Sequence, residues 1–261
     1  MNQANDKSFR LNTSSMNIKF LQWNIWYKEQ IDNVIQLIKE IDPDIICLQE
    51  LAVNCVNNPG ITNTAEYIAK QTGMFFYFEV AQRWKEDSEM EAVGNGIFSK
   101  YPITRKFAKH VQKPTMDFTD YSHEGRIYIE CDIQVNDTLL TVGTAHLSYV
   151  PWFKITEEKK IEVDNLIPLL KSKNYIFSGD LNSTPESYTV EVLSNKLTHC
   201  GPDYSKNSWT TKPFEHGGFR ENELNWRLDY VFASSDLQCE SSEIVKTNFS
   251  DHLPILARFK I

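Results

Sequence analysis

Residues 126–147 read RIYIECDIQVNDTLLTVGTAHL. Apolar side chains occupy every second position of the first half, at Ile127, Ile129, Cys131, Ile133 and Val135. This period of two predicts a half-buried antiparallel strand. Asn136-Asp137 predicts a turn, and Leu139 to Leu147 predicts the returning partner strand. The hairpin favours an antiparallel or mixed sheet.

The chain before this hairpin predicts further strands and two helices. Alternation over residues 18–24 predicts a strand that ends at Asn24. One helical face follows at spacings of three and four residues, formed by Ile31, Val34, Ile35 and Ile38. Pro43 ends that helix, and residues 45–48 predict a buried strand that finishes at Gln49-Glu50. We also expect a helix over residues 64–72, closed by Gly73, and strands over 75–80 and 96–99.

The chain after the hairpin repeats this mixture. Residues 154–171 predict a helix whose apolar face carries Ile161, Leu166 and Leu169. Residues 175–177, 227–232 and 253–259 predict strands, and Thr184-Pro185 predicts a helix start. Hairpins outnumber strand–helix–strand crossovers. The fold class is therefore α/β, with two packed mixed or antiparallel sheets flanked by helices.

Composition sets the broad class of protein. Of the 261 residues, 41% are hydrophobic and 12% aromatic, which suffices for one large core. We expect one domain over residues 17–261 and a disordered lead-in over residues 1–16. That polar lead-in lacks an apolar signal core, and no run is long enough to cross a bilayer. We expect a cytoplasmic monomer with no membrane insertion and no protein partner.

Charge and cysteine content exclude several functions. The net charge of −8 argues against a protein that coats nucleic acid, although an enzyme that contacts few phosphates remains compatible. The five cysteines form no Cys-x-x-Cys pair. We expect reduced structural thiols rather than a disulfide framework or a zinc site.

Polar residues suited to one task follow the apolar runs. They are Asn24, Glu50, His146, Asp180 with Asn182, Asp229, and the segment Ser250-Asp251-His252. One such residue is more often a surface or core group, but their joint occurrence indicates hydrolysis of a phosphate ester. Glu50 and Asp251 suit a hard divalent ion, and Asp180 suits the activation of water. Amides and histidines suit phosphate oxygens, and Asp229 could orient His252.

These segments together resemble the endonuclease/exonuclease/phosphatase superfamily. The resemblance runs from Phe20 to Phe259 and rests on seven short motifs in the family's order. They are residues 22–25 (QWNI), 48–50 (LQE), 124–126 (EGR), 144–147 (TAHL), 179–182 (GDLN), 227–231 (RLDYV) and 250–252 (SDH). The resemblance implies a four-layered α/β sandwich with its site at one mouth of the paired sheets.

The resemblance also implies roles for residues. Mg²⁺, or Mn²⁺ in its place, would bind Glu50, with Asn24 and Asp251 holding the ion or its waters. Asp180 and Asn182 would orient the nucleophile and the phosphate. His252, paired with Asp229, would contact the scissile phosphate. The choice between Asp180 and His252 as the general base stays open.

The motif at His146-Leu147 indicates a branch of the superfamily. The abasic-site endonucleases carry a Tyr-Val-Pro-Asn type of motif there, and an acid at the position of Trp26. The sequence is instead similar to deoxyribonucleases, sphingomyelinases, deadenylases, inositol-phosphate phosphatases and tyrosyl-DNA phosphodiesterases.

Two further residues have alternative interpretations. Trp209, with nearby aromatic residues, either stacks on a substrate or packs on the core. Arg126 either clamps a phosphate together with Asn24, Asn182 and His146 or forms a structural ion pair.

The function expected from the sequence is Mg²⁺-dependent hydrolysis of a phosphodiester, with nucleic-acid strands or ends as substrate. One alternative is a phosphatase or phosphodiesterase of a lipid or small phosphorylated molecule. Another is a binding protein that kept the fold and lost catalysis. The complete set of competent residues argues against the last.

Overall fold

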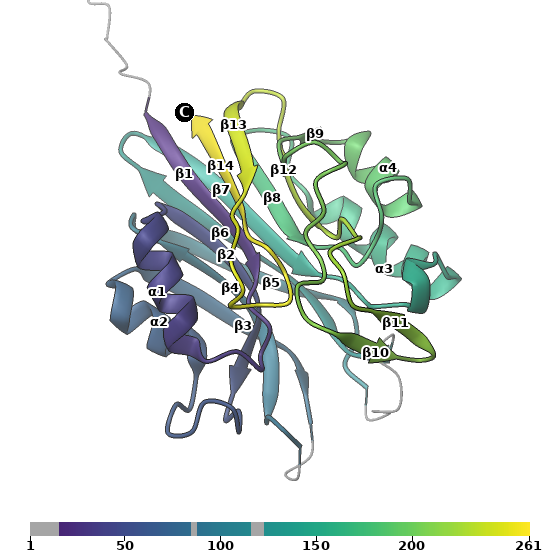
Figure 1. Ribbon diagram of the computed structural model, residues 1–261. Coiled ribbons are helices and arrows are strands. Elements are labelled where there is room, and N and C mark those ends of the chain that lie inside the picture. Colours follow the sequence, from purple (N-terminus) through teal and green to yellow (C-terminus); the bar gives the residue numbers. More distant parts are fainter. Residues whose placement is uncertain (1–15, 85–87, 116–122) are drawn as a thin grey trace, which may run out of the picture.

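The computed structural model describes residues 16–84, 88–115 and 123–261, and it contains two six-stranded sheets packed face to face (Figure 1). Helices cover both outer faces, which confirms the expected four-layered α/β sandwich. Most of the expected lead-in, residues 1–15, lies outside the described residues. Met16 is not part of a lead-in, because it exchanges two backbone hydrogen bonds of 2.9 Å with Ile261.

The first sheet has the strand order β13-β14-β1-β2-β4-β3. Its strands are β1 (Asn17–Asn24), β2 (Ile45–Val53), β3 (Phe75–Arg83), β4 (Ala92–Ser99), β13 (Gln238–Ile244) and β14 (Ile255–Lys260). Two helices, α1 (Ile31–Ile41) and α2 (Thr64–Thr72), cover its outer face (Figure 1). Both helices end in the left-handed region, at Asp42 with φ 51° and at Gly73 with φ 72°, as the sequence predicts for Gly73.

The second sheet has the order β5-β6-β7-β8-β12-β9. Its strands are β5 (Ile103–Gln112), β6 (Arg126–Val135), β7 (Thr138–His146), β8 (Tyr175–Asp180), β9 (Thr198–His199) and β12 (Asp229–Ala233). Helices α3 (Glu157–Leu166) and α4 (Tyr188–Ser194) cover it, and short turns η2 (Pro151–Phe153) and η3 (Ile167–Leu169) flank α3. A separate small hairpin joins β10 (Phe214–His216) to β11 (Phe219–Glu221).

Three apolar layers hold the sandwich together. The central layer lies between the sheets and joins residues such as Phe20 and Ile97 of one sheet to Ile129 and Val231 of the other. The outer layers lie under α1 and α2 and under α3 and α4. The hairpin of residues 126–147 forms as predicted, but β6 is buried on both faces. Its polar-side residues Tyr128 and Glu130 lie beneath the helical layer with no exposed surface.

Two helix predictions are wrong in detail. Helix α4 begins after Ser187, whose hydroxyl accepts the Val190 N–H, and not at Thr184-Pro185. In α3, Ile161 is 61% exposed, whereas the charged residues Lys159 and Glu162 are buried. Of the predicted apolar face, Leu166 is buried and Leu169 packs against the same core, but Ile161 faces outward because hydrogen-bonded charges occupy part of the inner side.

Strand directions bring the site residues to one edge of the sandwich. β1 is parallel to β2, and β7 is parallel to β8, so each pair ends at the same edge of its sheet. β12 runs antiparallel to β8 and β14 antiparallel to β1, so these two strands begin there. Among the described residues, no helix is long and apolar enough to span a membrane.

Candidate active site

Asp180 lies at the centre of the site. It is the last residue of β8, is 1% exposed, and stands opposite His146 in the parallel pairing of β7 and β8. Oδ1 accepts the backbone N–H of Asn182 at 2.9 Å, and Oδ2 accepts the Asn24 side-chain amide at 3.0 Å. Burial raises the pKa of Asp180 to about 6; the nearby Asp229 adds to the rise, and His252 opposes it. Asp180 is therefore a carboxylate at neutral pH and a stronger base than an exposed aspartate.

Asn24 joins two carboxylates across the two sheets. It ends β1, has no exposed surface, and donates to Glu50 Oε1 at 3.0 Å as well as to Asp180. Its own oxygen accepts the Trp26 N–H at 3.1 Å. This oxygen is the side-chain atom of Asn24 that could bind a metal, and it keeps a second lone pair for that purpose. In this geometry Asn24 orients the two carboxylates, and its expected role in holding the metal or its waters stays a prediction.

The sequence suggested that Glu50 ends a strand. In the structure Glu50 lies inside β2. The pairing of β2 with β4 is irregular between Leu48 and Leu51, and Glu50 has φ 61°. A bulge of this kind re-aims a side chain within a continuous strand. The Glu50 side chain, half-buried, accepts from Asn24 and from the Tyr27 N–H at 3.2 Å.

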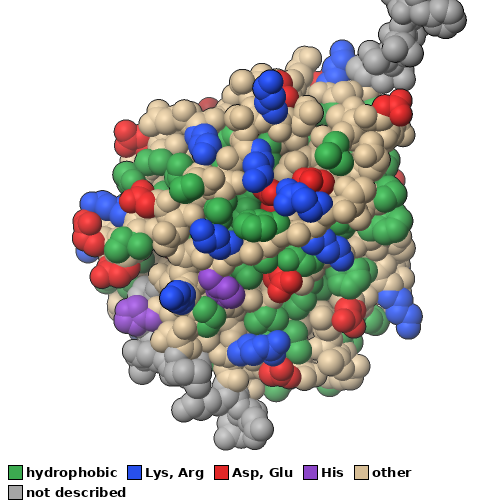
Figure 2. Space-filling view, turned by 180° about the vertical axis from the view of Figure 1, so that it is seen from behind, with side chains coloured by type: hydrophobic (Ala, Val, Ile, Leu, Met, Phe, Trp, Pro, Cys, Tyr) green, Lys and Arg blue, Asp and Glu red, His purple; other side chains and the backbone are tan. Residues whose placement is uncertain are grey.

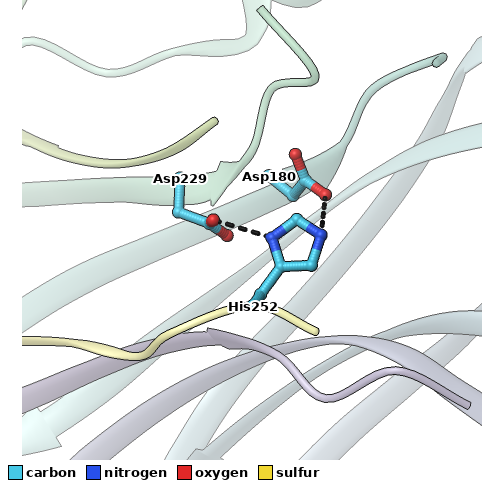
Figure 3. A group of neighbouring side chains, drawn as sticks. All are labelled: Asp180, Asp229 and His252. Carbon is cyan, nitrogen blue, oxygen red and sulfur yellow. Dashed lines mark hydrogen bonds and ion pairs between the residues drawn. The ribbon is translucent and has the colours of Figure 1, made fainter. Parts of the chain in front are cut away.

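His252 is held between two carboxylates (Figure 3). Its Nδ1 lies 2.8 Å from Asp229 Oδ2 and its Nε2 3.5 Å from Asp180 Oδ2. Burial opposes the charge on His252, but Asp229, Asp180 and Asp251 outweigh it and raise the pKa well above its usual value. These carboxylates therefore favour the protonated form of the imidazole. Asp229 begins β12 and does not end a strand, yet the expected pairing of Asp229 with His252 is present.

His146 has the opposite protonation state. It ends β7, and its Nε2 lies 3.1 Å from the Asn182 amide nitrogen and 3.4 Å from Asp180 Oδ2. Burial lowers the pKa of His146 well below its usual value, and the charges of Arg126, His252 and Lys159 lower it further. One site thus holds a neutral and a charged imidazole on either side of the same carboxylate.

Asn182 reaches the site by a turn and not by extended backbone. Its φ is 45°, and its amide donates to the Leu147 carbonyl at 3.0 Å. Extended backbone, along which alternate side chains share a side, ends at Asp180, so that rule does not place Asn182. The two residues nevertheless lie together, because the Asn182 N–H turns back to Asp180.

Trp209 contacts Asp251 and not solvent. It is 3% exposed, packs with Phe153, Phe214 and Phe219, and donates from Nε1 to Asp251 Oδ2 at 3.1 Å. The ring therefore packs on the core, which is the second of the two interpretations, and leaves little surface on which a substrate could stack. Its role in this geometry is to orient Asp251.

Arg126 begins β6 and is 5% exposed. Its guanidinium forms an ion pair with Glu124 at 3.0 Å. This contact matches the structural alternative, although the charge is close enough to His146 to lower that residue's pKa.

The acidic groups of the site fit a divalent ion. Burial and the negative charge of Glu50 both raise the pKa of Asp251, which reaches about 6 although His252 opposes the rise. A cation between Glu50 and Asp251 would relieve this repulsion. A second group, Asp180, Asp229 and His252, offers ligand atoms within 4.8 Å of one another. Because His252 is protonated and already donates to Asp229, we favour Glu50 and Asp251 as ligands.

Several residues of the quoted motifs support the site in roles that sequence reasoning did not assign. Buried Gln49 donates to Thr144 Oγ1 at 2.9 Å and also contacts Gln22, so a polar bridge crosses between the sheets. The Ser250 hydroxyl donates to the Asn24 carbonyl at 2.7 Å. Ser250 belongs to the motif at residues 250–252, and a glutamine inside an apolar strand was a further signal at Gln22 and Gln49.

Known structures share this fold at low sequence identity. An endonuclease/exonuclease/phosphatase from Beutenbergia cavernae is 16% identical with a TM-score of 0.74, covering 94% of this chain and 72% of its own. TDP2 from D. rerio, complexed with single-strand DNA product, is 14% identical with a TM-score of 0.66, covering 94% and 99%. The mannosyl-6-phosphatase Bt3783 of Bacteroides thetaiotaomicron is 14% identical with a TM-score of 0.64, covering 93% and 99%.

A family model decides the classification. No curated protein matches the chain. The model of the Endonuclease/Exonuclease/phosphatase family, whose members are phosphoester hydrolases that typically depend on a divalent metal, matches residues 21–252. That range contains every residue of the site described above. The chain belongs to the Endonuclease/Exonuclease/phosphatase family.

Proposed function

We propose that this chain is a Mg²⁺-dependent phosphodiester hydrolase that acts on nucleic-acid strands or ends. The observation that carries the proposal is Asp180, a buried carboxylate between a protonated His252 and a neutral His146. Such an arrangement separates a base from an acid within one small volume.

The chain's own residues divide the reaction between them. Asp180 accepts a proton from water and aims its oxygen at phosphorus, and the new P–O bond forms as the ester P–O bond breaks. His252, held by Asp229, donates toward the phosphate and the leaving oxygen, because the surrounding carboxylates raise its pKa and favour the protonated ring. Asn182 and His146 supply neutral contacts for the phosphate oxygens. The protonation states thus favour Asp180 over His252 as the base.

A bound Mg²⁺, or Mn²⁺ in its place, would offset the negative charge that develops on the phosphate oxygens. Glu50 and Asp251 would hold it. Asn24 and Trp209 keep these two carboxylates in place through hydrogen bonds of 3.0 and 3.1 Å.

The surface supports an enzyme with few phosphate contacts. On the face shown in Figure 2, basic, acidic and hydrophobic side chains interleave, and no single basic area dominates. The net charge of −8 agrees with this pattern. A surplus of acidic residues disfavours binding along a long phosphate backbone, so a strand end or a short segment is the better match.

An activity panel tests the proposal. Hydrolysis with Mg²⁺ or Mn²⁺ is measured on single- and double-stranded DNA, RNA, 5′-tyrosyl DNA, sphingomyelin, inositol phosphates and mannose 6-phosphate. We expect metal-dependent turnover of a nucleic-acid substrate that chelation abolishes. Turnover of a small phosphate ester alone would replace the substrate with the second candidate, a small-molecule phosphatase, which the likeness to a sugar phosphatase brings into the panel. Binding of an ester without turnover of any ester in the panel would contradict the proposal that the chain is an enzyme.

A further inference from the structure

Lys159 is a buried cation beside the site. It lies in the first turns of α3 with 2% of its surface exposed. Its Nζ donates to the Ser148 carbonyl at 2.6 Å and to the Leu181 carbonyl at 2.9 Å. Burial lowers the pKa of Lys159 to about 8, although the carboxylate of Glu162 favours the charged form. None of the steps described above uses this group.

The two carbonyls belong to the segments that leave β7 and β8. Ser148 follows His146 by two residues, and Leu181 lies between Asp180 and Asn182. The Lys159 ammonium group therefore joins two segments of the chain. One follows His146, and the other lies between Asp180 and Asn182.

Glu162 completes this connection one helical turn later. Its carboxylate accepts the Ser148 N–H at 3.0 and 3.2 Å and lies 3.7 Å from Lys159 Nζ. Glu162 is 1% exposed. Both backbone groups of Ser148 are thus bound to α3, one by each member of the pair.

We propose that Lys159 and Glu162 form a positioning pair that clamps the segments after β7 and β8, and so fixes His146 relative to Asp180 and Asn182. The effect on rate rests on the proposed function, whereas the effect on backbone order does not. Neither residue touches the reacting atoms.

Stability alone gives a poor reason for this pair. A buried ion pair is often no more stabilising than apolar side chains of similar volume, because both charges lose their hydration. An unbranched apolar residue such as methionine would fill the space of Lys159. What methionine would lack is a pair of directed hydrogen bonds to two different strand ends. A displacement of about 1 Å in a reacting group can lower a rate by about 10²-fold.

Hydrogen exchange tests the clamp without any substrate. Lys159→Met is compared with the matched control Lys160→Met, which removes a half-exposed lysine that pairs with Glu157 at 2.7 Å. We expect Lys159→Met to stay folded, to exchange faster in peptides covering residues 147–149 and 181–183, and to match wild type over residues 127–135. Glu162→Gln serves as the second variant if Lys159→Met does not fold, and should accelerate exchange at Ser148.

Kinetics on a substrate found by the panel test the consequence. We expect Lys159→Met to lower kcat by roughly 10- to 100-fold, with little change in KM, and Lys160→Met to match wild type. In a His146→Ala background the same change should cost much less, because its effect passes through that residue. The clamp would be overturned if the losses in kcat from Lys159→Met and His146→Ala were fully additive. Unchanged hydrogen exchange in both Lys159→Met and Glu162→Gln would also overturn it. Absence of turnover in wild type would instead refute the proposed function, and the exchange result would still decide the clamp.

Discussion

At the scale of single residues, neighbouring charges decide which of two buried histidines favours its protonated form. His146 and His252 lie 3.4 and 3.5 Å from the same oxygen of Asp180, yet their pKa values move in opposite directions. The difference arises because Asp229 bonds to His252 alone, whereas Arg126 and Lys159 act on His146. Position relative to fixed charges, and not residue type, assigns the acid.

Replacing the partner of His252 tests this assignment. Asp229→Asn removes the closest negative charge, so we expect the pKa of His252 to fall and its protonated fraction at neutral pH to shrink. The alkaline limb of the kcat/KM profile should then move to lower pH, with kcat reduced by at least roughly 10²-fold. Titration of the His252 ring by NMR and a pH–rate profile measure both effects. Asp137→Asn, on an exposed turn, is the control; an unmoved alkaline limb would remove His252 as the acid.

The expected metal ligand can be tested on its own. Glu50→Gln keeps the shape that the bulge in β2 imposes but replaces a carboxylate with an amide. We expect Mg²⁺ affinity, measured by calorimetry, to fall by at least roughly 10-fold while the circular dichroism spectrum is preserved. The exposed Glu40→Gln should bind as wild type does. Unchanged affinity in Glu50→Gln would move the ion to another group, such as that around Asp180.

At the same scale, sequence predicts which residues gather better than how they are oriented. Asn24, Glu50, Asp180, His146 and His252 could be chosen because each follows or precedes an apolar run. The bulge at Glu50 and the left-handed turn at Asn182 could not be predicted from the sequence, because both depend on pairing with distant strands. The hydrogen bond from Trp209 to Asp251 joins residues 42 positions apart, so no local sequence pattern predicts it.

At the scale of elements, two parallel pairs of strands carry the site to one edge. The backbone of β7 lies close to the position of a side chain at Gly179. A Cβ added there would lie 2.0 Å from the Ala145 carbonyl oxygen. Glycine is needed at this position because the backbone of the neighbouring strand occupies the space.

Gly179→Ala therefore tests whether strand pairing positions Asp180. The added methyl group must push β7 and β8 apart, so we expect destabilisation of about 1–3 kcal/mol and a loss of kcat greater than the loss of stability alone explains. Urea unfolding and turnover on folded protein measure the two effects. Ser178→Ala, which alters the preceding buried residue without adding volume, should leave both nearly unchanged. A fully active and stable Gly179→Ala variant would show that this spacing is not needed.

Edge strands explain most of what the sequence did not predict among the elements. β5 carries a mixture of charged and apolar residues, and its pairing with β6 is irregular at two places, so no strict alternation survives. β13 is likewise an edge strand with an irregular register near Cys239. Central strands such as β1 and β8 were predicted because their sequences carry a plain pattern, which is alternation in residues 18–24 and a short apolar run in residues 175–177.

At the scale of the whole molecule, the site lies where two sheets meet, and its carboxylates lower the stability of the metal-free protein. The raised pKa of Asp180, about 6 in the folded chain against a usual 3.8, means that the folded state holds this proton more tightly. A group whose pKa is raised by folding stabilises the folded state at a pH below its pKa in the unfolded chain. For Asp180 that contribution is lost as the pH rises through about 6. The charged carboxylate is thus unfavourable to folding at neutral pH.

Asp180→Asn should consequently melt at a higher temperature than wild type at pH 7.5 without metal. A gain of about 1–3 kcal/mol corresponds to roughly 3–9 °C for a chain of this size. The difference should shrink as pH falls through about 6, because wild type then becomes protonated. Melting curves from pH 5 to 8 provide the measurement. A variant less stable than wild type at pH 7.5 would mean that the charged form of Asp180 is stabilised by its neighbours.

The same variant gives the most direct test of the central claim, which is that Asp180 activates water for attack on phosphorus. The measurement is kcat of Asp180→Asn with saturating Mg²⁺ on the best substrate of the panel, beside wild type and the exposed Asp137→Asn. The amide keeps the size of the side chain but cannot take a proton, so we expect a folded variant that binds substrate and loses at least roughly 10²-fold in kcat. Turnover at the wild-type rate by a folded, substrate-bound Asp180→Asn would contradict the account.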